Sequence, residues 1–545
     1  MSRPTGVRLA RYGFGITDDG GRKVAEMVGP SGLGLWLPAT QQPADEGAAR
    51  LLTAMSRAAD PDLALRQLHR LVEAERRAGR TTAAGATREG GRMNNEGGVP
   101  PSPLLAALRE DAVLRERVIA VLGTSSALGD HLVANPDQWR ALADGVSGHP
   151  AGSPWPEAGE PQTVPQLRQA YRRVLLRIAA ADLTSERDLE ETMAALSALA
   201  DRTLAAAYRI AVNDLPAGTP EPRLAVLAMG KCGGEELNYV SDVDVIFVAA
   251  TDADLPAGTA VATRLIQICG QVAWPVDTAL RPEGRRGPLV RTLASHLAYY
   301  QRWARTWEFQ ALLKARPAAG DAALGQQWID QLAPLVWQAA ERPQAVDDVR
   351  AMRRRIIHHI PHHELNREIK RGPGGLRDIE FVVQLLQLVH GRADETLRER
   401  GTLPALRALV AGGYVGRADG EALVAGYRFL RAVEHRLQLR KLRRTHTVPD
   451  DPAGLRWLAH ALGYRSTPAR DAVEAFRADW IAHAAEVRRL HAKLLYRPLL
   501  EAVARVPADA LRMTPEAARH RLEVLGFADP AGALRHLQAL TGGVT

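Results

Sequence analysis

Hydrophobic residues recur at helical spacing along most of this chain, and a central interval breaks the pattern. Apolar positions three and four apart predict helices in the stretches 51–80, 103–144, 164–181, 184–213, 292–317 and most of 333–500. The first stretch is divided at Asp60-Pro61, because proline begins a helix readily but cannot continue one. A second boundary is expected at Thr184-Ser185-Glu186, a typical helix start. The pattern indicates a predominantly helical protein.

The central interval carries three apolar runs that are typical of strands. They cover residues 223–229, 241–250 and about 271–280, with a connecting helix at 260–270. We therefore expect an α+β fold, in which a small mixed sheet is flanked by helical domains. The expected divisions are an N-terminal region with a flexible loop at 81–102, a helical region, the core, a helical bundle and a terminal helical linker: 1–102, 103–215, 216–335, 336–500 and 501–545.

A glycine-rich turn joins the first two predicted strands. Gly230 ends the first run and Gly233 and Gly234 follow, so that backbone N–H groups can approach a phosphate closely. Asp242 and Asp244 lie in the second run, where alternate positions place both carboxylates on one face. A divalent cation such as Mg²⁺ makes such a pair tolerable. The combination predicts a nucleotidyl-transfer site, with a structural carboxylate pair as the alternative.

Further carboxylates lie near this motif. Asp277 in the third run would complete a two-metal site, and the alternative is a cap at a strand end, because Pro275 indicates an irregular strand. Asp252 and Asp254 lie past the second strand and are typical of a solvated turn. Because no second glycine turn with Asp-x-Asp occurs, the sequence predicts one catalytic core.

Basic side chains close to the turn are candidates for phosphate binding. Lys231 follows Gly230 and would neutralise phosphate charge, and a solvated turn lysine is the alternative. Arg281 begins an arginine cluster around a Gly-Pro loop that suits an anion. Lys314 and Arg316 follow in the segment WARTWEFQALLKARP.

The same segment contains an acidic residue and a set of aromatic ones. Glu308 is suited equally to the site and to a structural ion pair. The apolar spacing predicts that Trp303, Trp307 and Leu312 form its buried stripe. Cys232, inside the glycine turn, is either a reactive thiol or a small filler residue.

The segment RGPGGLRDIEF (371–381) opens another predicted helix through glycines. Asp378 falls in the first turn, where the helix dipole favours a carboxylate, and this role accounts for it fully. The glycine loop with Arg377 could also contact a nucleotide or substrate phosphate. The preceding run His358–His363 has metal-like spacing, but Pro361 breaks the helix it would need, so a surface location is expected.

The amino-acid composition argues for some classes of binding partner and against others. Hydrophobic residues make up 46% and charged residues 24% of the 545 residues, as in ordinary globular proteins, and two cysteines suit a reducing cytoplasm. The net charge of +8 permits an anionic substrate, whereas 5% aromatic residues and the lack of RNA-binding or zinc-finger motifs argue against nucleic acid. No signal peptide or run of membrane length is recognisable, so no membrane partner is expected.

Three segments carry a resemblance to a known family. They are GKCGGEELNYVSDVDVIF, VDTALRPEGRRGPLVRTLASHLAYYQRWARTWEFQALLKARP and GPGGLRDIEFVVQLLQLVHG. Together they resemble the glutamine synthetase adenylyltransferase/deadenylyltransferase family, which implies a DNA-polymerase-beta-like nucleotidyltransferase core. The segment GTSSALGDHLVANPDQW (123–139) resembles the N-terminal half of the actinobacterial type. With one core and an end at Thr545, the chain is expected to correspond to that half.

The resemblance assigns roles to residues by position. Asp242 and Asp244 match the metal-binding pair, Asp277 matches the third carboxylate, and Gly230 and Ser241 match phosphate-contacting turn positions. It implies Mg²⁺ as cofactor, glutamine synthetase as protein substrate, and ATP, ADP and phosphate as small-molecule partners. A PII-type signal protein is a further implied partner.

The implied reaction is removal of AMP from a tyrosine of glutamine synthetase by phosphorolysis, which gives ADP. Three alternatives remain open at this stage. They are forward transfer of AMP from ATP, a non-catalytic module that docks glutamine synthetase or a PII-type protein, and a template-independent RNA nucleotidyltransferase.

Overall fold

The structure is a computed structural model of the 545-residue chain. It describes residues 9–15, 18–86, 102–143, 159–339, 352–353 and 355–504, with four further positions, 519, 531, 532 and 534. Two compact units, Met1–His491 and Ala492–Thr545, divide the chain. The sheet and the candidate site lie in the first unit. No helix within the described ranges is long and apolar enough to cross a membrane.

The N-terminal part is helical apart from a two-stranded hairpin. The hairpin pairs β1 (Trp36–Leu37) with β2 (Gln42–Pro43). The break at Asp60-Pro61 is confirmed, since one helix ends at Ser56, the next begins at Pro61, and the Asp60 side chain accepts a hydrogen bond from Leu63 N at 2.8 Å. The helices are α2 (Asp18–Val28), α3 (Glu46–Ser56), α4 (Pro61–Ala86), α5 (Pro103–Glu110), α6 (Ala112–Thr124), α7 (Ser126–Ala134) and the short η2 (Pro136–Leu142).

Two boundaries in this part differ from the prediction. The loop expected at 81–102 is wrong for residues 81–86, which belong to α4, and residues 87–101 lie outside the described part. The helix expected to open at Thr184 begins at Leu189 instead, as α9 (Leu189–Asn213). Thr184 ends the preceding helix, α8 (Val164–Leu183), while Asp188 and Glu191 form the capping box of α9.

A five-stranded mixed sheet forms the centre of the first unit. β3 (Leu224–Ala228) is antiparallel to β4 (Val243–Ala249) and to β7 (Arg316–Gly320), while β5 (Val276–Asp277) and β6 (Val290–Thr292) pair in parallel with β4. The order is β5-β4-β3-β7, with β6 beside β4. The predicted helix at 260–270 is confirmed as part of α11 (Leu255–Val272).

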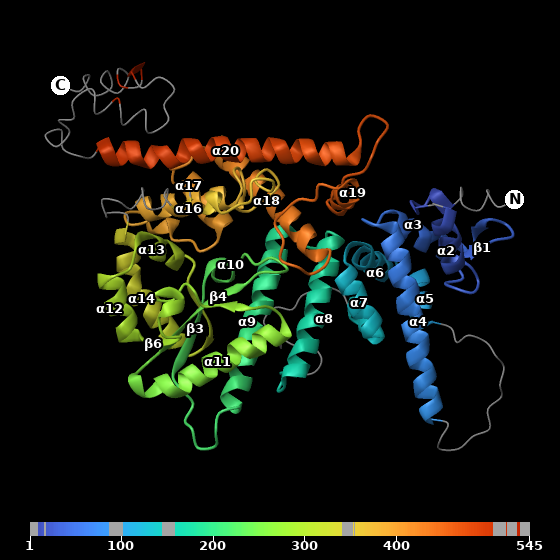
Figure 1. The fold of residues 1–545 in the computed structure, drawn as a ribbon, viewed down its shortest axis with the longest axis horizontal. Coiled ribbons are helices and arrows are strands. Elements are labelled where there is room, and N and C mark those ends of the chain that lie inside the picture. The colour runs from blue at the N-terminus through green and yellow to red at the C-terminus, as the bar shows by residue number, and fades with distance from the viewer. Residues whose placement is uncertain are drawn as a thin grey trace. The chain divides into compact units, whose positions relative to one another are not determined.

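Both faces of the sheet are covered, so its strands are apolar on both sides. Val226, Val245 and Phe247 pack into the cluster that includes α9 and α11, whereas Leu227 and Ile246 pack into a second cluster. The second cluster contains α12 (Leu293–Arg302), α13 (Thr306–Leu312) and α14 (Ala322–Gln338), which lie on the other side of the strands (Figure 1). The sheet is therefore held rigidly between two helical layers.

The region after the second predicted strand is less regular than the sequence indicated. The run at 271–280 contains only the two-residue strand β5, since α11 extends to Val272. The stretch 292–317 is two helices followed by the start of β7, because Arg316 and Pro317 pair with β3. The predicted buried stripe is wrong for Trp303, whose surface is 73% exposed.

The C-terminal part of the first unit is helical, as predicted. Its elements are α16 (Leu376–His390), η6 (Glu395–Leu397), α17 (Thr402–Ala411), α18 (Arg417–Leu439), α19 (Pro452–Ala461) and α20 (Ala472–Ala504), of which residues to His491 belong to this unit. Most of the linker predicted at 501–545 lies outside the described residues. A predominantly helical chain with a small mixed sheet is thus confirmed.

Gly233→Ala should destabilise the core strongly. A Cβ at this position would lie 1.9 Å from Lys314 O and 2.7 Å from Ala228 O, and backbone atoms cannot yield as a side chain can. We expect the free energy of unfolding in urea to fall by about 3 kcal/mol. Gly270→Ala is the matched control, because nothing lies within 4 Å of its Cβ, and helix propensity should raise stability by about 0.5–1 kcal/mol. Equal effects would contradict the packing argument.

Candidate functional site

A cavity of about 400 Å³ opens where β4 and β5 meet the helical part of the unit. The sheet side contributes the predicted residues Gly230, Lys231, Ser241, Asp242, Asp244, Asp277 and Lys314. The helical side contributes residues from α13, α16 and the segments beside them: Trp307, Gln310, Ala311, Met352, Ile356, Lys370, Arg377, Glu380, Phe381, Gln384 and Arg444, and Leu280 completes the lining. Residues far apart in sequence therefore enclose one polar space.

Two carboxylates face the cavity from neighbouring strands. Asp244 and Asp277 are direct partners in the parallel pairing of β4 with β5. Burial, followed by the charge of Asp277, raises the pKa of Asp244 from 3.8 to about 6. Two carboxylates forced this close need a cation or a proton to offset their repulsion. The pair therefore concentrates negative charge on the sheet side of the cavity.

The backbone conformation of Gly230 lets the glycine turn pass close to the Asp244 carboxylate. Gly230 has φ +53°, and a Cβ there would lie 2.5 Å from Asp244 Oδ2. Any other residue would be strained and would displace the carboxylate. Met229 N also donates to Asp244 O at 2.8 Å, which fixes the turn against β4. Gly230 is thus required for the close approach of the turn to the carboxylate.

Asp242 lies just before β4 and has a different partner. Its carboxylate accepts a hydrogen bond from Arg444, which follows α18 in the chain. Asp277 accepts a hydrogen bond from Ala279 N at 2.8 Å, and Arg285 lies 3.8 Å from it. In the described ranges no group of three His, Cys, Asp or Glu side chains is arranged to hold a metal ion. The structure brings the three aspartates to one cavity, but each with its own neighbour.

Lys231 is a buried residue rather than a solvated turn lysine. Its side chain is 11% exposed, and its ammonium donates to both Glu434 oxygens at 3.1 Å and to Asn238 at 3.3 Å. Burial lowers its pKa to about 7. The partner carboxylate is fully buried and also accepts a hydrogen bond from Arg431. Lys231 therefore joins the glycine turn to α18.

Three other predicted binding residues are not among the residues that line the cavity. Arg281 donates to the carbonyls of Thr278 at 2.8 Å and Gly287 at 3.1 Å, and so holds its own loop. Arg316 pairs with Asp201 at 2.8 Å. The Glu308 carboxylate accepts a hydrogen bond from Arg305 N at 3.0 Å as the cap of α13. These contacts give the three side chains structural partners, and their binding roles stay predictions.

The later glycines of the turn are also engaged in packing. Gly233 N donates to Met229 O at 2.9 Å and Gly234 N donates to Gly230 O at 3.0 Å. Gly233 must lack a side chain because Lys314 O would lie 1.9 Å from its Cβ, whereas a Cβ at Gly234 would lie 3.0 Å from Arg400 O. Lys314 itself donates to Glu236 at 2.7 Å and to Thr402 at 3.0 Å. This part of the turn is fixed by protein contacts.

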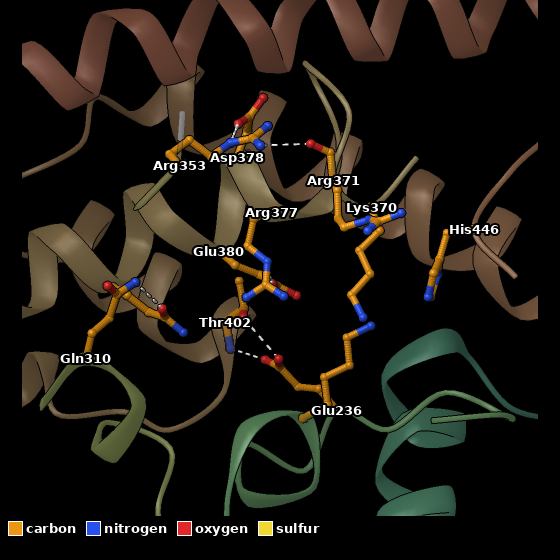
Figure 2. Close-up of polar contacts among 12 residues, drawn as sticks. Glu236, Gln310, Arg353, Lys370, Arg371, Arg377, Asp378, Glu380, Thr402 and His446 are labelled. Carbon is orange, nitrogen blue, oxygen red and sulfur yellow. Dashed lines mark hydrogen bonds and ion pairs between the residues drawn. The ribbon is translucent and has the colours of Figure 1, made fainter. Parts of the chain in front are cut away.

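The helical wall contains charged residues that the sequence gave little reason to place in the site. Figure 2 shows Lys370, Arg377 and Glu380 extending from this wall toward the segment that carries Glu236. Arg377 belonged to the glycine segment RGPGGLRDIEF, whose possible phosphate contact was noted from sequence. Lys370 and Arg444 had no motif to mark them. Only the fold brings these residues to the carboxylates.

Asp378 lies in the first turn of α16, as expected, but the helix dipole does not account for it fully, because it also forms a buried ion pair. Its carboxylate accepts a hydrogen bond from Gly374 N and another from Arg353, each at 2.6 Å, and the side chains of Asp378 and Arg353 are 4% exposed (Figure 2). Arg353 also donates to the carbonyls of Arg371 and Gly372, at 2.8 and 3.1 Å. The glycine loop is therefore anchored from behind, with the Lys370 and Arg377 side chains left on the cavity side.

The remaining sequence candidates have ordinary surroundings. The four histidines of 358–363 are exposed, as predicted. Asp252 and Asp254 form a short turn, η3 (Asp252–Asp254), as predicted. Cys232 is buried, and burial raises the pKa of its thiol, so it fills space rather than acting as a nucleophile.

Two known protein families match the parts of the chain that form this cavity. Residues 116–331 match the family described as glutamate-ammonia ligase adenylyltransferase. Residues 350–495, which include Lys370, Arg377 and Arg444, match a second family described as GlnD PII-uridylyltransferase. The two matches divide the cavity between them, with the carboxylates in the first and Lys370, Arg377 and Arg444 in the second.

The relatives that match most of this chain share one description. Bifunctional glutamine synthetase adenylyltransferase/adenylyl-removing enzymes from Streptomyces avermitilis, Streptomyces coelicolor and Nocardia farcinica are 54%, 52% and 48% identical to this chain. The matches cover 91% of this chain and 48%, 49% and 50% of those enzymes. The chain therefore spans about half the length of the curated relatives it matches. On this similarity the chain belongs to the glutamate-ammonia ligase adenylyltransferase family.

Proposed function

We propose that this chain removes AMP from the modified tyrosine of glutamine synthetase by transferring it to inorganic phosphate. The observation that carries the proposal is the Asp244–Asp277 pair, which faces a cavity whose opposite wall is cationic. Such a cavity suits a phosphodiester that must be approached by a second phosphate. The relatives are bifunctional in name, and the resemblance of residues 123–139 to the N-terminal half supports the adenylyl-removing direction.

The carboxylates suit Mg²⁺ by their chemistry. Mg²⁺ prefers oxygen ligands and commonly uses one or two carboxylates, with water and substrate phosphates completing its shell. Asp244 and Asp277 provide two such groups side by side, and the missing side chain of Gly230 leaves the space beside Asp244 clear. Asp242 would join them by releasing Arg444. A bound Mg²⁺ would supply charge neutralisation at the AMP phosphate.

In the proposed reaction a phosphate oxygen attacks the phosphorus of the tyrosyl-AMP ester. The new P–O bond forms as the bond from phosphorus to the tyrosine oxygen breaks, and the proton of hydrogen phosphate passes to the tyrosinate. The products are ADP and unmodified glutamine synthetase. The residues of the chain bind and orient the two phosphates, because this chemistry requires positioning and charge stabilisation more than a dedicated base.

Transfer of AMP from ATP to glutamine synthetase is the second candidate, since the relatives' name includes both activities. Adenylylated glutamine synthetase with phosphate tests the first direction, and unmodified glutamine synthetase with ATP tests the second. A regulatory module that only docks a partner would show neither reaction. Formation of ADP from the adenylylated protein is the result that supports the proposal, and its absence with the folded chain overturns it.

Asp244→Asn should reduce ADP formation by about 10²–10³-fold. The substitution removes one charge from the pair that would hold the cation, and losing a preorganised electrostatic contact of this kind typically costs that much in rate. The measurement is the initial rate of ADP release from adenylylated glutamine synthetase. Asp252→Asn is the matched control, because Asp252 is an exposed aspartate in the neighbouring turn, and its rate should stay within about twofold.

The aspartate pair also predicts a pH dependence of stability. The folded pKa of Asp244, about 6, lies above the usual 3.8, so without Mg²⁺ stability should fall as the pH rises from about 4 through 6. At pH 8 without Mg²⁺, Asp244→Asn should therefore be more stable than the wild type, by at most about 3 kcal/mol. Added Mg²⁺ should raise the wild-type Tm at pH 8 more than at pH 5, and should leave the variant unchanged. A Tm of the variant that responds equally to Mg²⁺ would show that the ion binds elsewhere.

A further inference from the structure

Three lysines line the cavity, and their partners differ. Lys314 donates to the buried carboxylate of Glu236 at 2.7 Å, and Lys231 lies 3.1 Å from the buried carboxylate of Glu434. The ammonium of Lys370 makes no hydrogen bond or ion pair with any residue of the described ranges. A buried ammonium with no carboxylate at hydrogen-bond distance is costly, and burial lowers the pKa of Lys370 although the more distant charges of Glu434 and Glu380 oppose this. A ligand anion would supply what the protein does not.

Arg377 extends into the same space from the first turn of α16. Its side chain is 33% exposed, and its guanidinium is held by Glu380 at 3.7 Å and by the ring of Phe381, whose centroid is 5.6 Å away. Arg377 Nε and Glu380 Oε1 are both buried and have no hydrogen-bond partner. Figure 2 shows the Lys370 and Arg377 side chains reaching from the helical wall on neighbouring paths. The Nε–H group of Arg377 is therefore available to donate a hydrogen bond to a ligand beside Lys370.

The backbone that carries these two cations is fixed independently of them. Ile369 N donates to His446 O at 2.9 Å, and Lys370 N donates to the buried Glu368 carboxylate at 2.8 Å. Behind the loop, Asp378 and Arg353 close the glycine segment with a buried ion pair. The side chains of Lys370 and Arg377 take no part in these contacts. The backbone that carries Lys370 and Arg377 is therefore fixed by other groups than their two side chains.

We propose that Lys370 and Arg377 form a binding subsite for a phosphate dianion, opposite the aspartate pair. Resting on the proposed function, the ligand is the inorganic phosphate that attacks the AMP phosphorus. The aspartate side would hold the AMP phosphate and the helical wall would hold the attacking one, so that the two groups meet between the walls. The terminal phosphates of ATP have the same chemistry, and the forward reaction would place them there.

The subsite explains how phosphate could be chosen over water as the attacking group. A dianion gains charge-assisted hydrogen bonds from an ammonium and a guanidinium, whereas a water molecule gains little. Removing one of these contacts should therefore weaken phosphate binding without altering the affinity for the protein substrate. A change in phosphate affinity alone would indicate a binding role, because a purely structural role would alter the affinity for both substrates.

The test is steady-state kinetics of the 545-residue chain with adenylylated glutamine synthetase and varied inorganic phosphate. Lys370→Met and Arg377→Met should each raise the KM for phosphate by about tenfold or more, with the KM for the adenylylated protein unchanged. Lys370→Arg should restore part of the phosphate affinity, because it restores the charge. Lys441→Met is the matched control, since Lys441 is exposed and outside the cavity lining, and its constants should match the wild type.

Two further measurements keep the outcome decisive. A parallel titration of ATP with unmodified glutamine synthetase distinguishes the two phosphate sources, because a raised KM in that arm alone assigns the subsite to ATP and overturns the assignment to inorganic phosphate. A thermal shift with inorganic phosphate tests binding directly. If the wild type forms no ADP, the proposed function fails. The subsite then stands only if phosphate stabilises the wild type and fails to stabilise Lys370→Met. An unchanged KM for phosphate in a folded, active Lys370→Met chain overturns the subsite.

Discussion

The buried carboxylate of Glu434 is the interaction on which the site depends. It is 0% exposed and accepts hydrogen bonds from Lys231 of the glycine turn and from Arg431 of its own helix, while His446 lies 3.0 Å away. These charges hold its pKa well below the usual value even though burial opposes them. Breaking one partner of such a set leaves an uncompensated buried charge, which typically costs about 3–5 kcal/mol.

The consequence of this contact is geometric. Arg431 also donates to the carbonyls of Glu236 and Leu237, the latter at 3.2 Å. These hydrogen bonds fix α18 against the segment that follows the glycine turn. Glu236 in turn accepts hydrogen bonds from Lys314 and, at 3.2 Å, from Tyr427. The sheet and the helical wall are thereby fixed face to face by buried ionic contacts. Apolar packing alone would allow them to slide, whereas paired charges specify one arrangement.

The sequence predicted the parts of the site that are local. Alternation along one strand was enough to place Asp242 and Asp244 together, and the apolar runs identified β3, β4 and α11. It could not predict the partner of Asp242, because Arg444 lies 202 positions away and carries no motif. It predicted too long a strand at β5 and placed the start of β7 in a helix. Both short strands exist because they pair with longer strands, a tertiary effect that periodicity does not contain.

The glycine turn is the clearest case in which the structure changes the meaning of a motif. Glycines next to a lysine favoured a phosphate cradle, but the N–H groups of Gly233 and Gly234 are bonded to backbone carbonyls and Lys231 is bonded to Glu434. The turn is shaped instead by the need to pass close to Asp244 and to Lys314 O. Among the cavity-lining residues that the structure describes, the cations without a carboxylate at hydrogen-bond distance are Lys370 and Arg377, on the opposite wall. A site that keeps its carboxylates on a sheet and its open cations on a separate helical layer binds a phosphate only when both layers are docked. Phosphate affinity in this chain is therefore expected to depend on the ionic contacts of Glu434 as much as on the residues that touch the ligand.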